Sequence, residues 1–156
     1  MILSKGNIAP SFNLFATPDQ RLSLDELKGN RLILAFYPAD WSPVCGDQMA
    51  LYNETLDFFK KFNAQLVGIS VDSKWCHTAF AENRNLNFPL LADFEPKGAI
   101  AKAYGAFNEI TGECKRALFV IDEVGIIQWS YLSPDAINPG ADGILDALEE
   151  MSQIKI

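Results

Sequence analysis

Residues 32–45 have the sequence LILAFYPADWSPVC, an apolar run followed by two prolines and a cysteine. The run of consecutive apolar residues is typical of a strand that is buried on both faces, and Pro38 ends it. Ser42 is a favoured N-cap, and Pro43 suits the first helical position because its missing N–H would have no partner there. We therefore expect a strand before Pro38 and a helix from Pro43 to about Phe62.

The cysteine at the end of this stretch falls in the first turn of the expected helix. With Ser42 as the N-cap, Cys45 takes position N3. The first turn offers unpaired N–H groups and the positive end of the helix dipole, and both favour a thiolate over a thiol. The thiolate is the nucleophilic form, whereas a cysteine that only fills a core is more typical of a strand or an apolar helix face. We interpret Cys45 as a reactive cysteine.

The rest of the chain predicts strands and helices that alternate first and then give way to a hairpin. The expected strands are 31–37, 66–71, 116–121 and 126–132, and the other expected helices are 73–83, 96–104 and 142–152. This order predicts an α/β fold in which helices flank both faces of a mixed central sheet. A chain of 156 residues without a visible linker suits one domain, residues 1–156.

Bulk properties narrow the class of protein. A net charge of -7 argues against nucleic acid or an anionic membrane as the main partner. The N-terminus lacks the apolar core of a signal peptide, and no run approaches transmembrane length. The three cysteines are widely spaced and odd in number, so they do not suggest a disulfide framework. We expect a cytoplasmic protein that binds neither membrane nor nucleic acid.

Three residues of the opening stretch carry a family signature. The spacing Pro-x-x-x-Ser/Thr-x-x-Cys, formed here by Pro38, Ser42 and Cys45, resembles the active-site motif of the peroxiredoxins of the AhpC/TSA superfamily. Arg116 begins an apolar strand that resembles the second signature of that family. The similarity extends over nearly the whole chain, and it implies a thioredoxin-like fold. Residues 88–109 are most similar to the E-type alkyl hydroperoxide reductases, a group in which a one-cysteine mechanism is common.

The resemblance implies a thiol-dependent peroxidase that reduces hydrogen peroxide or organic hydroperoxides. The Cys45 thiolate would attack the peroxide and become a sulfenic acid, while Ser42 and the Cys45 N–H polarise the O–O bond. Arg116, as a permanently charged guanidinium, would stabilise the departing oxygen, and Pro38 would shield the thiolate from water. Sulfur carries the two electrons, so we expect no cofactor.

Two further residues are candidates for support of this site. Gln48 lies three residues after Cys45, where many family members have Glu, and could orient the arginine. Trp41 lies at the rim of the predicted site and could contact substrate or a neighbouring subunit; its simpler role is to cover the loop. Related proteins commonly associate through this loop, around Trp41 and Pro43, so we expect a homodimer or a higher homo-oligomer.

The other two cysteines bear on how the sulfenic acid is resolved. The common resolving position five residues after Cys45 holds Ala50, and residues 151–156 contain no cysteine. Cys76 lies early in a predicted helix. Cys114 lies two residues before Arg116, so the two side chains share a sheet face if both residues are extended. Either cysteine remains a candidate resolving thiol. We favour an external thiol of the thioredoxin, glutaredoxin or low-molecular-weight type.

Other classes of function fit less well. A thiol–disulfide oxidoreductase needs Cys-x-x-Cys, and Gln48 occupies the second position. A peroxide sensor or holdase would use the same chemistry at Cys45 without steady turnover, and this alternative stays open. His77 is the only histidine, and its neighbour Cys76 points about 100° away from it on a helix, which makes a poor chelate. We expect neither a metal ion nor a nucleotide.

Overall fold

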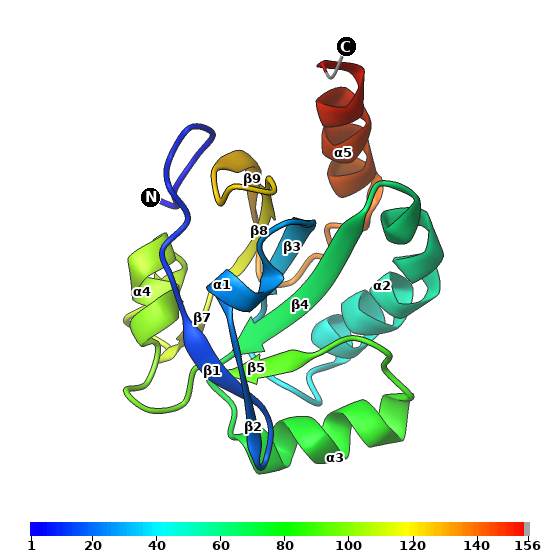
Figure 1. Ribbon diagram of the computed structural model, residues 1–156. Helices are drawn as coiled ribbons and strands as arrows, with labels where there is room; N and C mark the ends of the chain where they lie inside the picture. The colour runs from blue at the N-terminus through cyan, green and yellow to red at the C-terminus, as the bar shows by residue number, and fades with distance from the viewer. Residues whose placement is uncertain (155–156) are drawn as a thin grey trace.

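The computed structural model describes residues 1–154, and a seven-stranded mixed sheet lies at its centre (Figure 1). The strand order is β2-β1-β5-β4-β3-β8-β9. These strands are β1 (Asn13–Thr17), β2 (Gln20–Ser23), β3 (Arg31–Phe36), β4 (Ala64–Ser70), β5 (Leu90–Ala92), β8 (Arg116–Ile121) and β9 (Ile127–Ser133). Strands β3, β4 and β5 are parallel, whereas β8 is antiparallel to both β3 and β9. A separate small sheet pairs β6 (Phe107–Asn108) with β7 (Glu113–Cys114).

Helices cover both faces of the large sheet, as the sequence predicts (Figure 1). Helices α2 (Pro43–Lys61) and α5 (Asp142–Ile154) pack on one face, and α1 (Leu24–Leu27) and α4 (Ala99–Tyr104) contribute to the core on the other. Helix α3 (Lys74–Arg84) lies against β1 and β5. No helix within residues 1–154 is long and apolar enough to cross a membrane.

The central strand β3 explains why the two faces have separate cores. All six of its residues are buried, and alternate side chains point to opposite faces. Leu32, Leu34 and Phe36 join the core beside α1 and α4, whereas Ile33 and Ala35 join the core beside α2 and α5. The apolar side chains of β3 therefore contribute to both cores. The chain continues from the carboxyl end of β3 into the loop that precedes α2.

One expected boundary is wrong. The helix before Tyr104 begins at Ala99 and not at Pro96. Gly98 has a left-handed backbone with φ 71°, so it cannot be part of a right-handed α-helix, and the helix can begin only after it. The carboxylate of Asp93 accepts hydrogen bonds from the N–H groups of Ile100 and Ala101, at 3.1 and 2.9 Å. A buried acid that lies a few residues before the helix thus caps it.

Candidate active site

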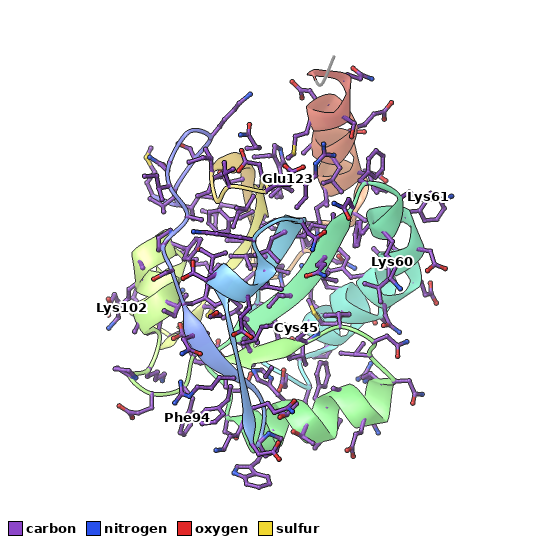
Figure 2. The ribbon with its side chains drawn as sticks, in the orientation of Figure 1. Cys45, Lys60, Lys61, Phe94, Lys102 and Glu123 are labelled. Carbon is purple, nitrogen blue, oxygen red and sulfur yellow. The ribbon has the colours of Figure 1, made fainter. Side chains whose placement is uncertain are left out.

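The start of α2 has the geometry that its sequence predicts. Ser42 is the N-cap, and its Oγ accepts a hydrogen bond from the Cys45 N–H at 3.4 Å, while Pro43 occupies the first turn. The Cys45 side chain has no exposed surface and lies between the sheet and α2 (Figure 2). The thiol is therefore held in the first turn of a long helix and is screened from bulk water.

Arg116, the first residue of β8, points its guanidinium at this thiol. Its Nη1 donates to Cys45 Sγ at 3.3 Å and to Gln48 Oε1 at 2.7 Å. Its Nε and Nη2 both donate to the carbonyl oxygen of Asp135, at 3.1 and 2.8 Å. The side chain is 1% exposed, and these bonds fix the guanidinium at both ends. The strand therefore places a rigid cation beside the sulfur.

A second row of contacts holds Gln48 in place. Its Nε2 donates to the hydroxyl of Tyr52 at 3.1 Å, and that hydroxyl donates to the Gly140 carbonyl at 3.0 Å. Burial raises the pKa of Tyr52 to about 12, so the phenol keeps its proton and its role as a donor at neutral pH. The amide of Gln48 is thereby oriented with its oxygen toward Arg116. Sequence reasoning did not find the carbonyl groups of Asp135 and Gly140, because a backbone acceptor leaves no mark on residue type.

The charge of Arg116 is not neutralised by an acid. Its partners are a thiol, an amide oxygen and a backbone carbonyl, and no carboxylate within residues 1–154 forms a salt bridge with it. A buried guanidinium whose partners are all uncharged retains its full electrostatic interaction with nearby groups, and here the Cys45 sulfur is in direct contact with it. The arrangement favours negative charge on sulfur and on any oxygen bound next to it.

The loop that leads into α2 contributes two contacts to the neighbouring helix α3. Trp41 is 47% exposed and packs edge-on against Phe80, with ring centroids 5.3 Å apart. Asp40 is buried and lies within 2.6 Å of the His77 ring. Asp40 and His77 are polar residues at this site that sequence reasoning did not connect. The unusual pairing of a buried acid with the only histidine could not be seen before the two elements were brought together.

Cys114 lies on the wrong face to meet Cys45. It belongs to the core beside α1 and α4, whereas Cys45 and the guanidinium of Arg116 meet on the other face. The expected shared face of Cys114 and Arg116 is wrong because β7 and β8 are separate strands, and between them the Lys115 N–H bonds to the Ala106 carbonyl at 2.7 Å. Burial raises the pKa of the Cys114 thiol far above its ordinary value. This thiol is a structural part of the core.

Cys76 is placed in the first turn of α3, where the Ser73 hydroxyl caps its N–H at 3.1 Å. Partial burial, followed by the carboxylates of Asp40 and Asp72, raises the pKa of Cys76 to about 11. At neutral pH only a small fraction of this group is thiolate. All three cysteines of the chain are free.

The larger cavities do not reach the buried sulfur. A cavity of about 560 Å³ is lined by residues that include Leu22, Leu56 and Phe88, and one of about 420 Å³ lies beside Trp75 and Phe94. Cys45 lines neither of them.

A buried thiol in a helix N-terminus, next to a guanidinium that bonds to no acid, defines a thiol-based redox protein on an α/β scaffold. Comparison with known proteins then gives the family. The AhpC/TSA family model matches residues 5–130. The chain therefore belongs to the AhpC/TSA family and is a peroxiredoxin.

Individual relatives agree with this assignment. A peroxiredoxin Q from Triticum aestivum chloroplasts is 35% identical over 130 residues, which cover 83% of this chain and 59% of that protein. The putative peroxiredoxin ycf42 of Pyropia yezoensis is 31% identical over 163 residues, covering 98% of this chain and 80% of that protein. This chain thus spans little more than half the length of the wheat relative.

Solved structures confirm the thioredoxin-like fold class. A reduced 2-Cys peroxiredoxin from Plasmodium vivax superposes with a TM-score of 0.88 at 28% identity, covering 97% of this chain and 83% of that one. The peroxidoxin BcpB of Mycobacterium tuberculosis gives a TM-score of 0.86 at 26% identity, covering 96% of this chain and 98% of that one. These names do not single out the E-type group, so membership of that group stays a prediction.

Proposed function

We propose that this chain is a thiol-dependent peroxidase in which Cys45 is the peroxide-reducing residue. The observation that carries the proposal is the 3.3 Å contact between Arg116 Nη1 and Cys45 Sγ, made by a guanidinium that has no acidic partner in residues 1–154. A cation in this place favours the thiolate before the reaction and stabilises the oxygen that departs during it. Both effects act at the atoms where the charge changes.

The reaction needs only atoms that the site and the peroxide supply. The Cys45 thiolate attacks one peroxide oxygen, an S–O bond forms and the O–O bond breaks. Sulfur gives up two electrons, and the second oxygen leaves as hydroxide or alkoxide and takes up the proton that the Cys45 thiol released on ionisation, which gives water or an alcohol. The Ser42 hydroxyl accepts the Cys45 N–H and still has its own proton to donate to a bound oxygen. Pro38 lies just after β3, beside this turn, and limits the access of water.

An external thiol completes the proposed cycle. The sulfenic acid condenses with this thiol to give a mixed disulfide and water, and a second thiol then releases the Cys45 thiol. Two features support an external reductant: Cys114 lies in the opposite core, and the pKa of Cys76 is about 11, which leaves little thiolate at neutral pH. The reductant is a thiol of the thioredoxin, glutaredoxin or low-molecular-weight type.

The burial of Cys45 also bears on which peroxides it reduces fastest. Because Cys45 has no exposed surface, the smallest peroxide needs the least opening of the loops around it. We infer that hydrogen peroxide is reduced faster than bulky organic hydroperoxides. A series of alkyl hydroperoxides of increasing size should show a falling second-order rate constant for Cys45 oxidation.

Steady turnover is the test of the proposed activity. In an excess of dithiothreitol the wild-type chain should consume many equivalents of hydrogen peroxide, and Cys45→Ser should consume none above background. Cys76→Ser is the matched control and should stay within about twofold of the wild-type rate, because Cys76 is the less reactive thiol. Consumption of only one equivalent would favour the sensor or holdase alternative, and full activity of Cys45→Ser would contradict the proposal.

We propose that two copies of the chain associate through the loop that precedes α2. The exposed Trp41 and Pro43 lie beside the candidate site, and association of two copies through this loop would remove the Trp41 ring from water. Sedimentation at working concentration should give a homodimer; a monomer would contradict this.

Three free thiols suit a reducing compartment, for which we propose the cytoplasm.

A further inference from the structure

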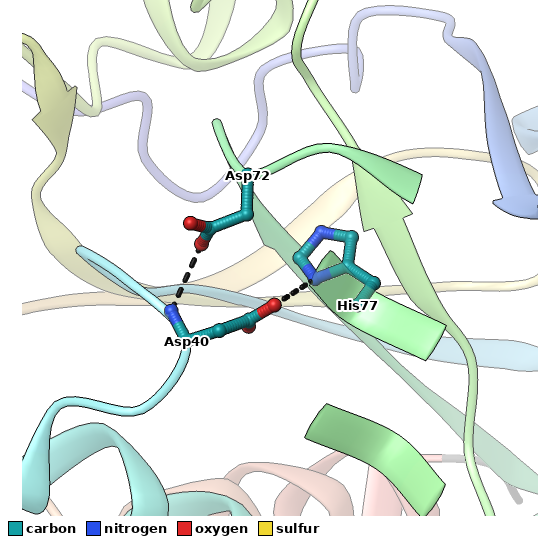
Figure 3. Close-up of side chains that lie close together, drawn as sticks. All are labelled: Asp40, Asp72 and His77. Atoms are coloured by element: carbon teal, nitrogen blue, oxygen red, sulfur yellow. Dashed lines mark hydrogen bonds and ion pairs between the residues drawn. The ribbon is translucent and has the colours of Figure 1, made fainter. Parts of the chain in front are cut away.

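Asp40 lies in the loop between β3 and the N-cap of α2, and both its side chain and its backbone N–H form hydrogen bonds. Its Oδ1 accepts from the Tyr37 hydroxyl at 2.7 Å, and its Oδ2 lies 2.6 Å from His77 Nδ1. Its backbone N–H donates to Asp72 Oδ2 at 2.9 Å, and Figure 3 shows the last two contacts side by side. Burial and the nearby Asp40 carboxylate raise the pKa of Tyr37, so this phenol remains a donor.

His77 faces an acceptor on each side of its ring. Nδ1 points to the Asp40 carboxylate, and Nε2 lies 3.1 Å from the Leu91 carbonyl oxygen, which can only accept. These two contacts hold the ring between the Asp40 carboxyl group and the Leu91 carbonyl, so both of its nitrogens have a partner. His77 is 2% exposed and Asp40 is 6% exposed, so the pair is screened from water. Removal of one member of such a pair leaves the other buried without its partner.

The pair holds a loop with an unfavourable backbone. Trp41, the residue between Asp40 and Ser42, has φ 70°, in the left-handed region that a bulky side chain rarely adopts. A residue persists there only when its surroundings fix it. The fixing contacts come from α3, through His77 on one side and the Phe80 ring on the other. Ser42, the residue after Trp41, is the one whose hydroxyl caps Cys45.

We propose that His77 is a positioning residue for the peroxidase reaction, which through its hydrogen bond with Asp40 holds Ser42 in the place where it can donate to bound peroxide. The inference rests on the proposed function. Arg116 reaches the sulfur from β8 and is independent of this loop, so His77 acts on the placement of Ser42 and not on the cation beside the thiol. The two contributions can therefore be separated by experiment.

The test compares His77→Gln, Asp40→Asn and the double variant with Thr78→Ala, a neighbouring α3 residue whose hydroxyl bonds only within its helix. Single-turnover oxidation of Cys45 by hydrogen peroxide should slow about tenfold or more in each single variant, since small displacements of a reacting group have effects of this order. Alkylation of Cys45 by iodoacetamide should change less than about threefold. The double variant, whose two amides can bond to each other, should recover at least about threefold over the slower single variant.

Several results would overturn the inference. Folded single variants that retain the wild-type peroxide rate would do so, as would a double variant no faster than the slower single one. Equal losses of the peroxide and alkylation rates would point to a general structural defect. If the wild-type chain itself does not reduce peroxide, the proposed function fails, and the pair is then tested by spectroscopy alone.

Nuclear magnetic resonance observes the contact between His77 and Asp40 directly, because His77 is the only histidine of the chain. The buried wild-type ring should show a slowly exchanging N–H proton, and Asp40→Asn should shift its resonance or speed its exchange. Ring signals that are unchanged in Asp40→Asn would overturn the assignment. So would a stoichiometric metal ion in the purified protein that disappears in His77→Gln, since ligand atoms of Asp40, Asp72 and His77 lie within 4.8 Å of one another.

Discussion

Two helices of this peroxiredoxin begin in the same way and end up with cysteines of different character. In α2 the Ser42 hydroxyl caps the N–H of Cys45 at 3.4 Å, and in α3 the Ser73 hydroxyl caps the N–H of Cys76 at 3.1 Å. Both thiols are therefore third in a capped first turn and share the favourable end of a helix dipole. The difference lies beyond the helix: Cys45 faces Arg116, whereas Cys76 faces two carboxylates.

The helix dipole and a nearby full charge differ in how strongly they act on the ionisation of a thiol. A helix terminus contributes about 0.3–1 kcal/mol to a nearby charge at ordinary exposure. A full charge about 4 Å away contributes about 4 kcal/mol at the effective dielectric constant of a protein surface. Burial first, and then the carboxylates of Asp40 and Asp72, outweigh the dipole at Cys76 and raise its pKa to about 11. A capped helix start is therefore not enough to make a cysteine reactive.

The largest expected effect comes from removal of the cation that distinguishes the two turns. Arg116→Met should slow the oxidation of Cys45 by hydrogen peroxide about 10²–10³-fold, the range seen when one stabilising donor is lost. Arg116→Lys should recover only part of the rate, because an ammonium cannot reach Cys45, Gln48 and the Asp135 carbonyl together. Stopped-flow fluorescence or competition kinetics would measure this.

Arg21→Met is the matched control for that experiment, since Arg21 lies over the Phe15 ring on the far edge of the sheet. It should leave the rate unchanged. If a folded Arg116→Met variant oxidises Cys45 less than about fivefold more slowly than the wild type, the cation does not explain why Cys45 and Cys76 differ.

A smaller effect is expected from the residue that orients the cation. Gln48→Met removes a hydrogen bond to a charged group, worth about 1.5 kcal/mol, and should slow Cys45 oxidation roughly tenfold. Gln48→Glu keeps an acceptor for Arg116 but pairs the guanidinium with an acid, so it should lose more than the Met variant. The same single-turnover assay distinguishes them, and a Glu variant faster than Met would show that orientation of Arg116 matters more than the absence of an acid beside it.

The smallest expected effect concerns Cys76, in the first turn of α3. Asp72→Asn removes one of the carboxylates that raise the pKa of Cys76, so that pKa should fall and the thiolate fraction should rise at a given pH. Alkylation of Cys76 at mildly alkaline pH should accelerate by about threefold, as followed by peptide mass spectrometry. Burial, the largest cause of the shift, is unchanged, so the effect is modest. A slower alkylation would mean that the carboxylates do not oppose ionisation there.

Much of this comparison could be predicted from local sequence and part of it could not. The Ser-Pro-x-Cys start of α2 and the apolar β3 are local signals, and the structure has both where they were expected. The boundary of α4 was missed because its cap, Asp93, is not adjacent to Ala99 in the sequence. Gly98 occupies the N-cap, so the capping carboxylate comes from outside the position where a sequence pattern would look for it.

The candidate site shows the same limit. The proximity of Arg116 to Cys45 was expected from family resemblance, and the structure brings the two together at 3.3 Å. The carbonyls of Asp135 and Gly140 were not expected, because any residue type can supply them. The face of Cys114 was mistaken because the period-two rule of a strand fails where one strand ends and another begins.

The most direct test of the central claim treats the fully reduced protein with one equivalent of hydrogen peroxide and records its intact mass with and without a sulfenic-acid trap. The account predicts a single trapped adduct, located on Cys45 by peptide mapping, with Cys76 and Cys114 still free. Loss of two hydrogen atoms without an adduct, or a trap located on Cys76, would contradict it, because the second turn would then take part in the chemistry that its carboxylates oppose.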